Sequence, residues 1–248
     1  MHAPITVLAV LAGYLLGAIS FARIIGNQVV PGEDLQLTQV DVGGSDKKYE
    51  LVSVSATSIA MRAGLRLGCL TSLLDMLKVT FPVMFFRLVY PETDYYLITA
   101  AAGVAGHNFP AYYRFKGGLG LSPLLGGLIV IDWLAVPVTT LLSGLLGLFI
   151  FRNVVFVYGG APFLLIPWMW LRFQDSSHLF YALTVNILCG VAAVPSFNNY
   201  IVMQRRGEFD QSALLETGYM AYVTHFLRKR GWMKQRNTVS HEKLQEKI

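Results

Sequence analysis

The chain has 248 residues and a formal net charge of +5; 54% of its residues are hydrophobic and only 14% are charged. A soluble domain carries roughly 25% charged residues, so this composition excludes a water-soluble fold, which could not cover its surface with so few charges. Lipid accepts the excess apolar surface, and the composition therefore indicates an integral membrane protein. Both cysteines, Cys69 and Cys189, stand in apolar stretches, where we expect small packing residues and not a disulfide or a metal site.

Apolar stretches recur along the chain, and a helix that crosses a bilayer needs about 20 mainly apolar residues. We expect crossings at 4–25, 65–90, 95–113, 119–131, 134–151, 154–171 and 179–203, of which the fourth is short. The first stretch lacks the basic start and the cleavage site of a signal peptide, so we expect it to be retained. The predicted fold class is all-α, a polytopic membrane protein with about seven transmembrane helices. Residues 27–55, between the first two crossings, are polar and of mixed charge, and their turn-forming glycines predict a long loop.

Basic residues lie in alternate connections, which predicts how the chain is oriented. These residues are Lys47, Lys48, Arg114, Lys116, Arg152, Arg205 and Arg206. The positive-inside tendency then places the N-terminus outside and the C-terminus inside. We expect a membrane domain over 1–205 and a basic cytoplasmic tail over 206–248. The tail suits a helix that lies on anionic lipid, or else a solvated or disordered end, and it has too few basic groups to bind nucleic acid.

Two charged residues, Asp75 and Lys78, stand inside the second predicted crossing. Their spacing of three places both on the same side of a helix. Charges at this depth persist when they are paired, hydrated or turned toward a cavity. For Asp75 we favour a structural ion pair. Lys78 suits equally the partner in that pair and a ligand for an anionic substrate.

Hydroxyl residues cluster just before the same crossing, at Ser53, Ser55, Thr57 and Ser58. This pattern is first of all typical of a helix N-cap. A second interpretation adds an anion, because the free N–H groups at a helix start favour phosphate. Arg62, about one turn further on, would add positive charge.

A glycine-rich motif follows the third crossing: residues 106–110 read GHNFP and residues 115–120 read FKGGLG. Glycines allow positive φ and a close approach of the backbone to a ligand, and successive N–H groups in such a turn bind anions. A plain re-entrant turn explains the glycines equally well. His107 is more typical of a hydrogen-bonded core residue than of a catalyst. For Arg152 there are two interpretations: it anchors helix ends to lipid headgroups, or it joins Lys78 and Lys116 around a phosphorylated lipid precursor.

Three motifs together resemble the bacterial acyl-phosphate:glycerol-3-phosphate acyltransferase family. Residues 13–21 read GYLLGAISF and are similar to the family's GYLLGSIPF. The Ala56-Thr57 pair, Gly64, Gly68 and the DMLK of 75–78 are similar to ATN…G…G…LLDxLKG, and residues 106–120 to GHxFPxxxxFKGGKG. The family is also seven-spanning with its N-terminus outside, in agreement with the charge pattern.

The resemblance implies an activity and a site. Family members transfer a fatty acyl group from acyl phosphate to the 1-hydroxyl of glycerol 3-phosphate, which gives lysophosphatidic acid for phospholipid biosynthesis in the bacterial plasma membrane, without a metal or other cofactor. The catalytic residues implied are Thr57, His107 and Lys116. The residues implied to bind the substrate phosphates are Ser53, Ser55, Arg62, Lys78, Gly117, Gly118, Gly120 and Arg152.

The sequence also departs from the family pattern. Leu51 stands where the family has a serine, Met61 where it has an arginine, and Leu119 where it has a lysine. The later serines and the histidine–asparagine pair fall on Val155, Tyr158, and Asn198 or Asn199. A non-catalytic relative that binds lipid or serves as a partner subunit is therefore the second hypothesis. A small transporter is the third, supported only by the Asp75–Lys78 pair.

Overall fold

The computed structural model describes residues 2–41, 48–151, 153–206 and 229–230. The helices are α1 (Ala3–Gly17), α2 (Phe21–Val29), α3 (Ala56–Ala63), α4 (Leu65–Val89), α5 (Tyr95–Asn108), α6 (Leu121–Ile131), α7 (Ala135–Leu145), α8 (Val154–Gly159), α9 (Ala161–Phe173) and α10 (Ser176–Arg205). A 3-10 turn lies at Ala111–Tyr113 and a π turn at Leu146–Ile150. The helical body confirms the predicted all-α class. Arg152 and most of the predicted tail lie outside the described residues.

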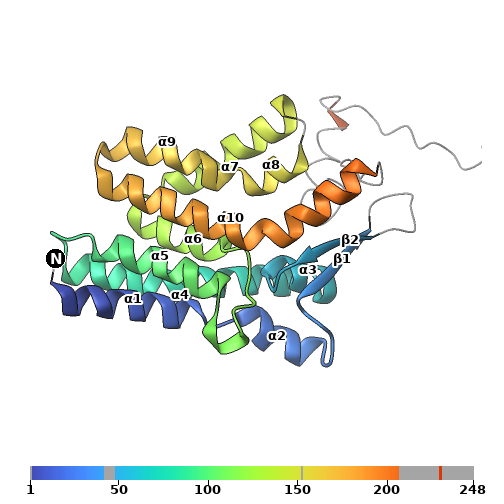
Figure 1. The fold of residues 1–248 in the computed structure, drawn as a ribbon, viewed down its shortest axis with the longest axis horizontal. Helices are drawn as coiled ribbons and strands as arrows, with labels where there is room; N and C mark the ends of the chain where they lie inside the picture. Colours follow the sequence, from blue (N-terminus) through green and yellow to red (C-terminus); the bar gives the residue numbers. More distant parts are fainter. Residues whose placement is uncertain (1, 42–47, 152, 207–228, 231–248) are drawn as a thin grey trace, which may run out of the picture.

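The longer helices run side by side through the body of the molecule (Figure 1). Helix α5 is central, since it contacts α1, α4, α6 and α10. Among the described residues, three segments are long and apolar enough to cross a membrane: Ala3–Val29, Leu65–Val89 and Ser176–Arg205. The others are shorter than the predicted crossings. Helix α5, for example, has 14 residues and ends at Asn108, because Pro110 follows and disfavours helical backbone in the residue before it.

The first predicted crossing, 4–25, falls within the apolar segment Ala3–Val29, but the structure divides this segment into two helices. Helix α1 ends at Gly17, and α2 begins at Phe21 with Ser20 as its N-cap, whose side chain accepts from the Arg23 N–H at 3.4 Å. Serine favours this position because its hydroxyl satisfies an N–H that has no partner within the helix. The break leaves the backbone carbonyl of Ile19 free for a side chain of another helix, as described below.

The long polar segment 27–55, predicted as a loop, contains a β-hairpin. Strand β1 (Leu37–Asp41) pairs antiparallel with β2 (Lys48–Val52), so that Leu37 lies opposite Val52. Figure 1 places this hairpin, α2, α3 and the last turns of α10 at one end of the helices, with the N-terminus at the other end. We call this end the hairpin end. That it faces the cytoplasm stays a prediction.

Glycines bring α1 and α5 into close contact. A Cβ on Gly106 would collide with the Tyr14 carbonyl oxygen, and a Cβ on Gly17 would collide with Gly103. Small residues at a helix interface let backbones approach closely, which is the usual means of helix association in lipid. Beyond this interface, the buried core extends through α4, α6, α9 and α10. Its members Val79, Leu128, Met169 and Val185 are 0–1% exposed.

We expect Gly106→Ala to lower the melting temperature in detergent, because the added methyl overpacks the α1–α5 interface at a cost of about 1–3 kcal/mol. The matched control is Gly190→Ala on α10, where a Cβ meets no atom within 4 Å. There alanine should stabilise the helix by up to about 1 kcal/mol. Equal melting temperatures for the two variants would contradict this account of the interface.

Candidate functional site

The glycine-rich segment turns back onto the end of α5. After Pro110 and the 3-10 turn, Arg114 and Phe115 adopt φ of 54° and 60°, which reverses the chain. The Gly118 N–H then donates to the His107 carbonyl at 3.1 Å. On the α1 side, the Tyr14 hydroxyl donates to the Phe109 carbonyl at 2.7 Å. The structure therefore contains the re-entrant turn that the sequence predicted as one of two alternatives.

Close packing explains why glycine occupies these positions. A Cβ on Gly117 would collide with the His107 carbonyl oxygen, and one on Gly118 would collide with Nε2 of the His107 ring. Gly120 has φ of 81°, a backbone conformation that glycine adopts without steric cost, and a Cβ there would collide with the Asn108 amide.

The same turn also presents unpaired N–H groups, which the anion interpretation requires. Within the described residues, the N–H groups of Leu119, Gly120 and Leu121 have no acceptor, whereas those of Lys116 and Gly118 do. Leu121 is the first residue of α6, whose N-terminus carries the positive end of the helix dipole. Free N–H groups at a helix start favour phosphate and carboxylate groups. The turn and the start of α6 together therefore suit an anion.

The hydroxyl cluster lies directly against this turn. The Val54 N–H donates to the Gly117 carbonyl at 3.1 Å, and the neighbouring Ser53 and Ser55 hydroxyls are 3.3 Å apart. Ser55 is the N-cap of α3, and its side chain and that of Ser58 form a capping box. The predicted N-cap is thus confirmed. Thr57 lies in the first turn of α3 and is exposed.

Lys78 lies at the centre of a buried polar network. Its ammonium donates to Asp75 Oδ1 at 2.7 Å, to the Ile19 carbonyl at 2.5 Å and to His107 Nδ1 at 3.0 Å. The Lys78, Asp75 and His107 side chains are each less than 10% exposed. An ammonium has three N–H donors, so all of them are used here. The predicted pairing of Asp75 with Lys78 is confirmed, and a phosphate could bind Lys78 only by displacing one of these acceptors.

The network also decides the state of His107. Because an ammonium can only donate, His107 Nδ1 accepts, and we assign the proton of the neutral ring to Nε2. Nε2 faces Gly118, since a Cβ added to Gly118 would collide with it. His107 is therefore a hydrogen-bonded core residue whose remaining donor is directed at the glycine-rich turn.

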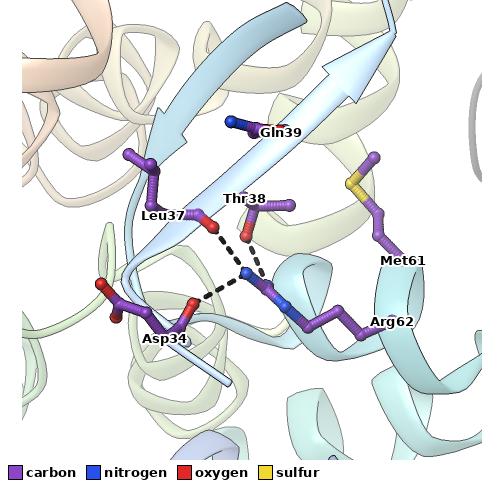
Figure 2. Close-up of a pocket in the computed structure, with 6 residues that line it drawn as sticks. All are labelled: Asp34, Leu37, Thr38, Gln39, Met61 and Arg62. Carbon is purple, nitrogen blue, oxygen red and sulfur yellow. Dashed lines mark hydrogen bonds between the residues drawn. The ribbon is translucent and has the colours of Figure 1, made fainter. Parts of the chain in front are cut away.

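Arg62 does not contact this turn but the base of the hairpin. Figure 2 shows its guanidinium directed at Asp34, Leu37 and Thr38, beside a cavity of about 330 Å³ that these residues line together with Gln39 and Met61. Lys116 approaches the same segment from the glycine-rich turn, since its ammonium donates to Gln36 Oε1 at 3.5 Å.

Sequence reasoning missed two polar residues that support the site, Arg23 and Ser196, and it gave Asn199 only as one of two counterparts of a family residue. Arg23 on α2 donates to the Lys116 carbonyl at 2.8 Å, and its guanidinium lies 4.8 Å from the centre of the Tyr113 ring. On α10, Ser196 accepts from the Val52 N–H at 3.1 Å, and Asn199 donates to the Glu50 carbonyl at 3.3 Å. Their only signal in the sequence is a polar residue near the end of an apolar stretch, which does not indicate a partner.

The predicted residues therefore fall into two sets. One set meets around the end of α5: Ser53, Ser55, Lys78, His107, Gly117, Gly118 and Gly120. The other stands apart from it, with Thr57 exposed on α3, Lys116 over the segment before β1, and Arg62 at the hairpin.

Comparison with known proteins gives a consistent result. Residues 7–205 match the protein family described as "Glycerol-3-phosphate acyltransferase". The protein of that name from Desulfotalea psychrophila is 31% identical over 177 residues, which is 68% of this chain and 80% of the relative. The one from Pseudothermotoga lettingae is 27% identical over 172 residues, 63% of this chain and 80% of the relative. The one from Pelagibacter ubique is 32% identical over 122 residues, 49% of this chain and 56% of the relative.

Two solved structures share the fold. The crystal structure of PlsY, an integral membrane glycerol 3-phosphate acyltransferase, in its glycerol 3-phosphate form superposes with a TM-score of 0.66 and 24% identity over 88% of this chain and 98% of that chain. Its lysophosphatidic acid form gives a TM-score of 0.64 over 83% of this chain and 94% of that chain. This likeness and the family match together identify the chain as an all-α, multi-pass integral membrane protein.

We expect Lys78→Met to destabilise the protein by about 3–5 kcal/mol, because the Asp75 carboxylate is then buried without its partner. Thermal unfolding in detergent measures this effect. The double variant Asp75→Leu/Lys78→Met removes both charges and should recover most of the lost stability. A single variant as stable as the unmodified protein would show that the ion pair is not needed to keep Asp75 buried.

Proposed function

This chain belongs to the glycerol-3-phosphate acyltransferase family, and we propose that it transfers a fatty acyl group from acyl phosphate to the 1-hydroxyl of glycerol 3-phosphate. The products are lysophosphatidic acid, a precursor in phospholipid biosynthesis, and inorganic phosphate. One observation carries the proposal: the unpaired N–H groups of the glycine-rich turn and of the α6 N-terminus lie beside the Ser53–Ser55 segment and His107. PlsY, whose fold this chain shares, has been crystallised in a glycerol 3-phosphate form and in a lysophosphatidic acid form.

The geometry suits phosphate recognition by the backbone. Two substrates that each carry a phosphate need positive potential without a deep cluster of lysines, which lipid would make costly. The N–H groups of Leu119, Gly120 and Leu121 supply that potential through the backbone, and the exposed Lys116 adds a charge. The Ser53 and Ser55 hydroxyls extend the set of polar groups.

In the proposed reaction, the acceptor hydroxyl oxygen forms a bond to the carbonyl carbon of the acyl phosphate. The bond between that carbon and the phosphate oxygen breaks, and the phosphate leaves with the bonding electrons while the proton of the hydroxyl passes to it. Holding both substrates in line supplies much of the acceleration. Donors that face the carbonyl oxygen stabilise the charge it gains as the carbon becomes tetrahedral. We propose His107, Lys116 and Thr57 for these roles, with the exposed side chains of Lys116 and Thr57 turning toward the bound substrates.

The remaining residues have roles that follow from their surroundings. Gly117, Gly118 and Gly120 allow the turn to form, and Lys78 keeps His107 oriented. Arg152, which lies outside the described residues, stays a proposed phosphate ligand. We further propose seven crossings with the N-terminus outside, which would place the hairpin end and the basic tail at the cytoplasmic face of a bacterial plasma membrane.

A second candidate function is that of a non-catalytic, lipid-binding relative. The observation that favours it is the replacement of charged family residues, since Leu119 and Met61 stand where the family has a lysine and an arginine. The transporter hypothesis loses its support, because the Asp75–Lys78 pair is enclosed by His107 and Ile19 and has no donor free for cargo.

We expect the purified full-length protein in lipid vesicles to release inorganic phosphate from acyl phosphate only when glycerol 3-phosphate is present. Lys116→Ala should lower the rate by about 100-fold, as loss of a transition-state donor does. Arg172→Ala, which removes a half-exposed arginine next to α10, is the charge control and should keep the rate. Absence of release with any acyl phosphate and acceptor would support the non-catalytic relative.

We expect Gly118→Ala to reduce kcat by about 100-fold, because its methyl would displace the turn from the His107 ring, and a misplacement of about 1 Å can cost that much. The melting temperature should also fall, because Gly118 is buried and the added methyl overpacks the turn against His107 at a cost of about 1–3 kcal/mol. The kcat values are therefore compared at a temperature at which both variants stay folded. Gly144→Ala on α7, where a Cβ meets no atom within 4 Å, is the matched control. An unchanged kcat in Gly118→Ala would show that the position of the turn does not affect the reaction.

A further inference from the structure

Arg62 uses its whole guanidinium to hold backbone and side chains of the protein. It makes five hydrogen bonds of 2.5–3.4 Å, to Glu33 Oε2, Thr38 Oγ1 and the carbonyl oxygens of Ser58, Asp34 and Leu37. A guanidinium has five N–H donors, so no donor is left for a ligand. The Arg62 side chain is only 14% exposed, and Thr38 is 2% exposed.

The cavity beside Arg62 is also unsuited to a phosphate. Figure 2 shows Asp34 on its wall next to the guanidinium. The Glu33 carboxylate already pairs with Arg62 at 3.0 Å, and the Asp34 carboxylate accepts from the Gln36 N–H at 2.9 Å. An anion that binds Arg62 here would have to displace existing partners of the arginine, among them the Glu33 carboxylate, which would repel it.

The point at which Arg62 holds the hairpin is linked directly to the candidate site. Leu37 and Thr38 on β1 pair with Val52 and Leu51 on β2. Strand β2 ends at Val52, and the chain continues into Ser53 and Val54, whose N–H donates to the Gly117 carbonyl. The guanidinium is thus linked to the glycine-rich turn through its hydrogen bond to Leu37, the Leu37–Val52 pair, the chain from Val52 to Val54 and the hydrogen bond from Val54 to Gly117.

The hairpin is held from a second side as well. On α10, Ser196 accepts from the Val52 N–H, and Asn199 donates to the Glu50 carbonyl. With α10 on one side and Arg62 of α3 on the other, β2 has little freedom to shift. The short strands alone would not hold this position, because an isolated two-stranded hairpin is marginally stable.

We propose that Arg62 is a positioning residue, which fixes the hairpin and thereby holds the Ser53–Ser55 segment against the glycine-rich turn, and that it does not bind substrate phosphate. Its place at the hairpin is a matter of structure alone. Its effect on turnover rests on the proposed acyltransferase function.

Amide hydrogen exchange of the full-length protein in vesicles tests the structural part. Arg62→Lys keeps the positive charge, but an ammonium cannot reproduce the set of hydrogen bonds that the planar guanidinium makes. Thr38→Val removes one acceptor of Arg62, a hydroxyl that is too buried to reach a substrate. Both variants should speed exchange across residues 52–55 by about tenfold, since a hydrogen bond to a charged group is worth at least a factor of that size. Thr139→Val, equally buried on α7 and bonded to the Ala135 carbonyl, is the matched control and should leave that segment unchanged.

Kinetics test the functional part. Arg62→Lys and Thr38→Val should produce the same pattern, a kcat lowered by about tenfold with the KM for glycerol 3-phosphate changed much less, and their effects should not add in the double variant. Thr139→Val should show neither change. A raised KM in Arg62→Lys with no effect of Thr38→Val would identify Arg62 as a substrate ligand and overturn the proposal.

The two hypotheses can fail separately. If the unmodified protein releases no phosphate but exchange at 52–55 responds to both variants, the proposed function fails and the hairpin role of Arg62 stands. If exchange at 52–55 is unchanged in both Arg62→Lys and Thr38→Val, the positioning proposal fails whatever the activity.

Discussion

A buried ammonium with three fixed acceptors determines how the site is built. Lys78 lies among apolar helices, where an unpaired charge would be prohibitively costly, and so each of its N–H donors must meet an acceptor. One acceptor is Asp75 on the same helix, one is the ring of His107, and one is the Ile19 carbonyl, which is available only because the first apolar segment breaks there. The charge thus joins α4, α5 and the α1–α2 junction.

Around this network, backbone N–H groups supply the positive potential that charged side chains could otherwise provide. The glycine-rich turn packs so closely on His107 and Asn108 that only glycine fits, and it leaves the N–H groups ahead of α6 unpaired. The nearby arginines bind groups of the protein itself: Arg23 donates to the Lys116 carbonyl, and Arg62 donates to the Leu37 carbonyl of the hairpin. This arrangement supports anion recognition by dipoles at the hairpin end, with few charges exposed to lipid.

Local patterns predicted local structure well. The hydroxyls before the second crossing predicted the Ser55 cap, because a cap depends on residues within one turn. The spacing of Asp75 and Lys78 predicted their pairing, because it needs only helical geometry. Two details differ from the sequence prediction: the segment that contains the crossing at 4–25 is divided into two helices, and residues 27–55 contain a hairpin. Hydropathy does not detect a break that a distant lysine stabilises, and strand pairing brings together residues that are far apart in the chain.

The sequence by itself determined that the protein lies in a membrane, that its body is helical and that its motifs resemble one acyltransferase family, because composition, periodicity and motif order are local properties. Only the tertiary structure decided which polar residues meet. His107, Ser55 and Gly118 converge because the chain folds back onto α5. Arg62 is instead directed at the hairpin by the carbonyls of Asp34 and Leu37, which lie 28 and 25 residues away in sequence. Partners of this kind depend on how segments pack, which no stretch of residues specifies alone.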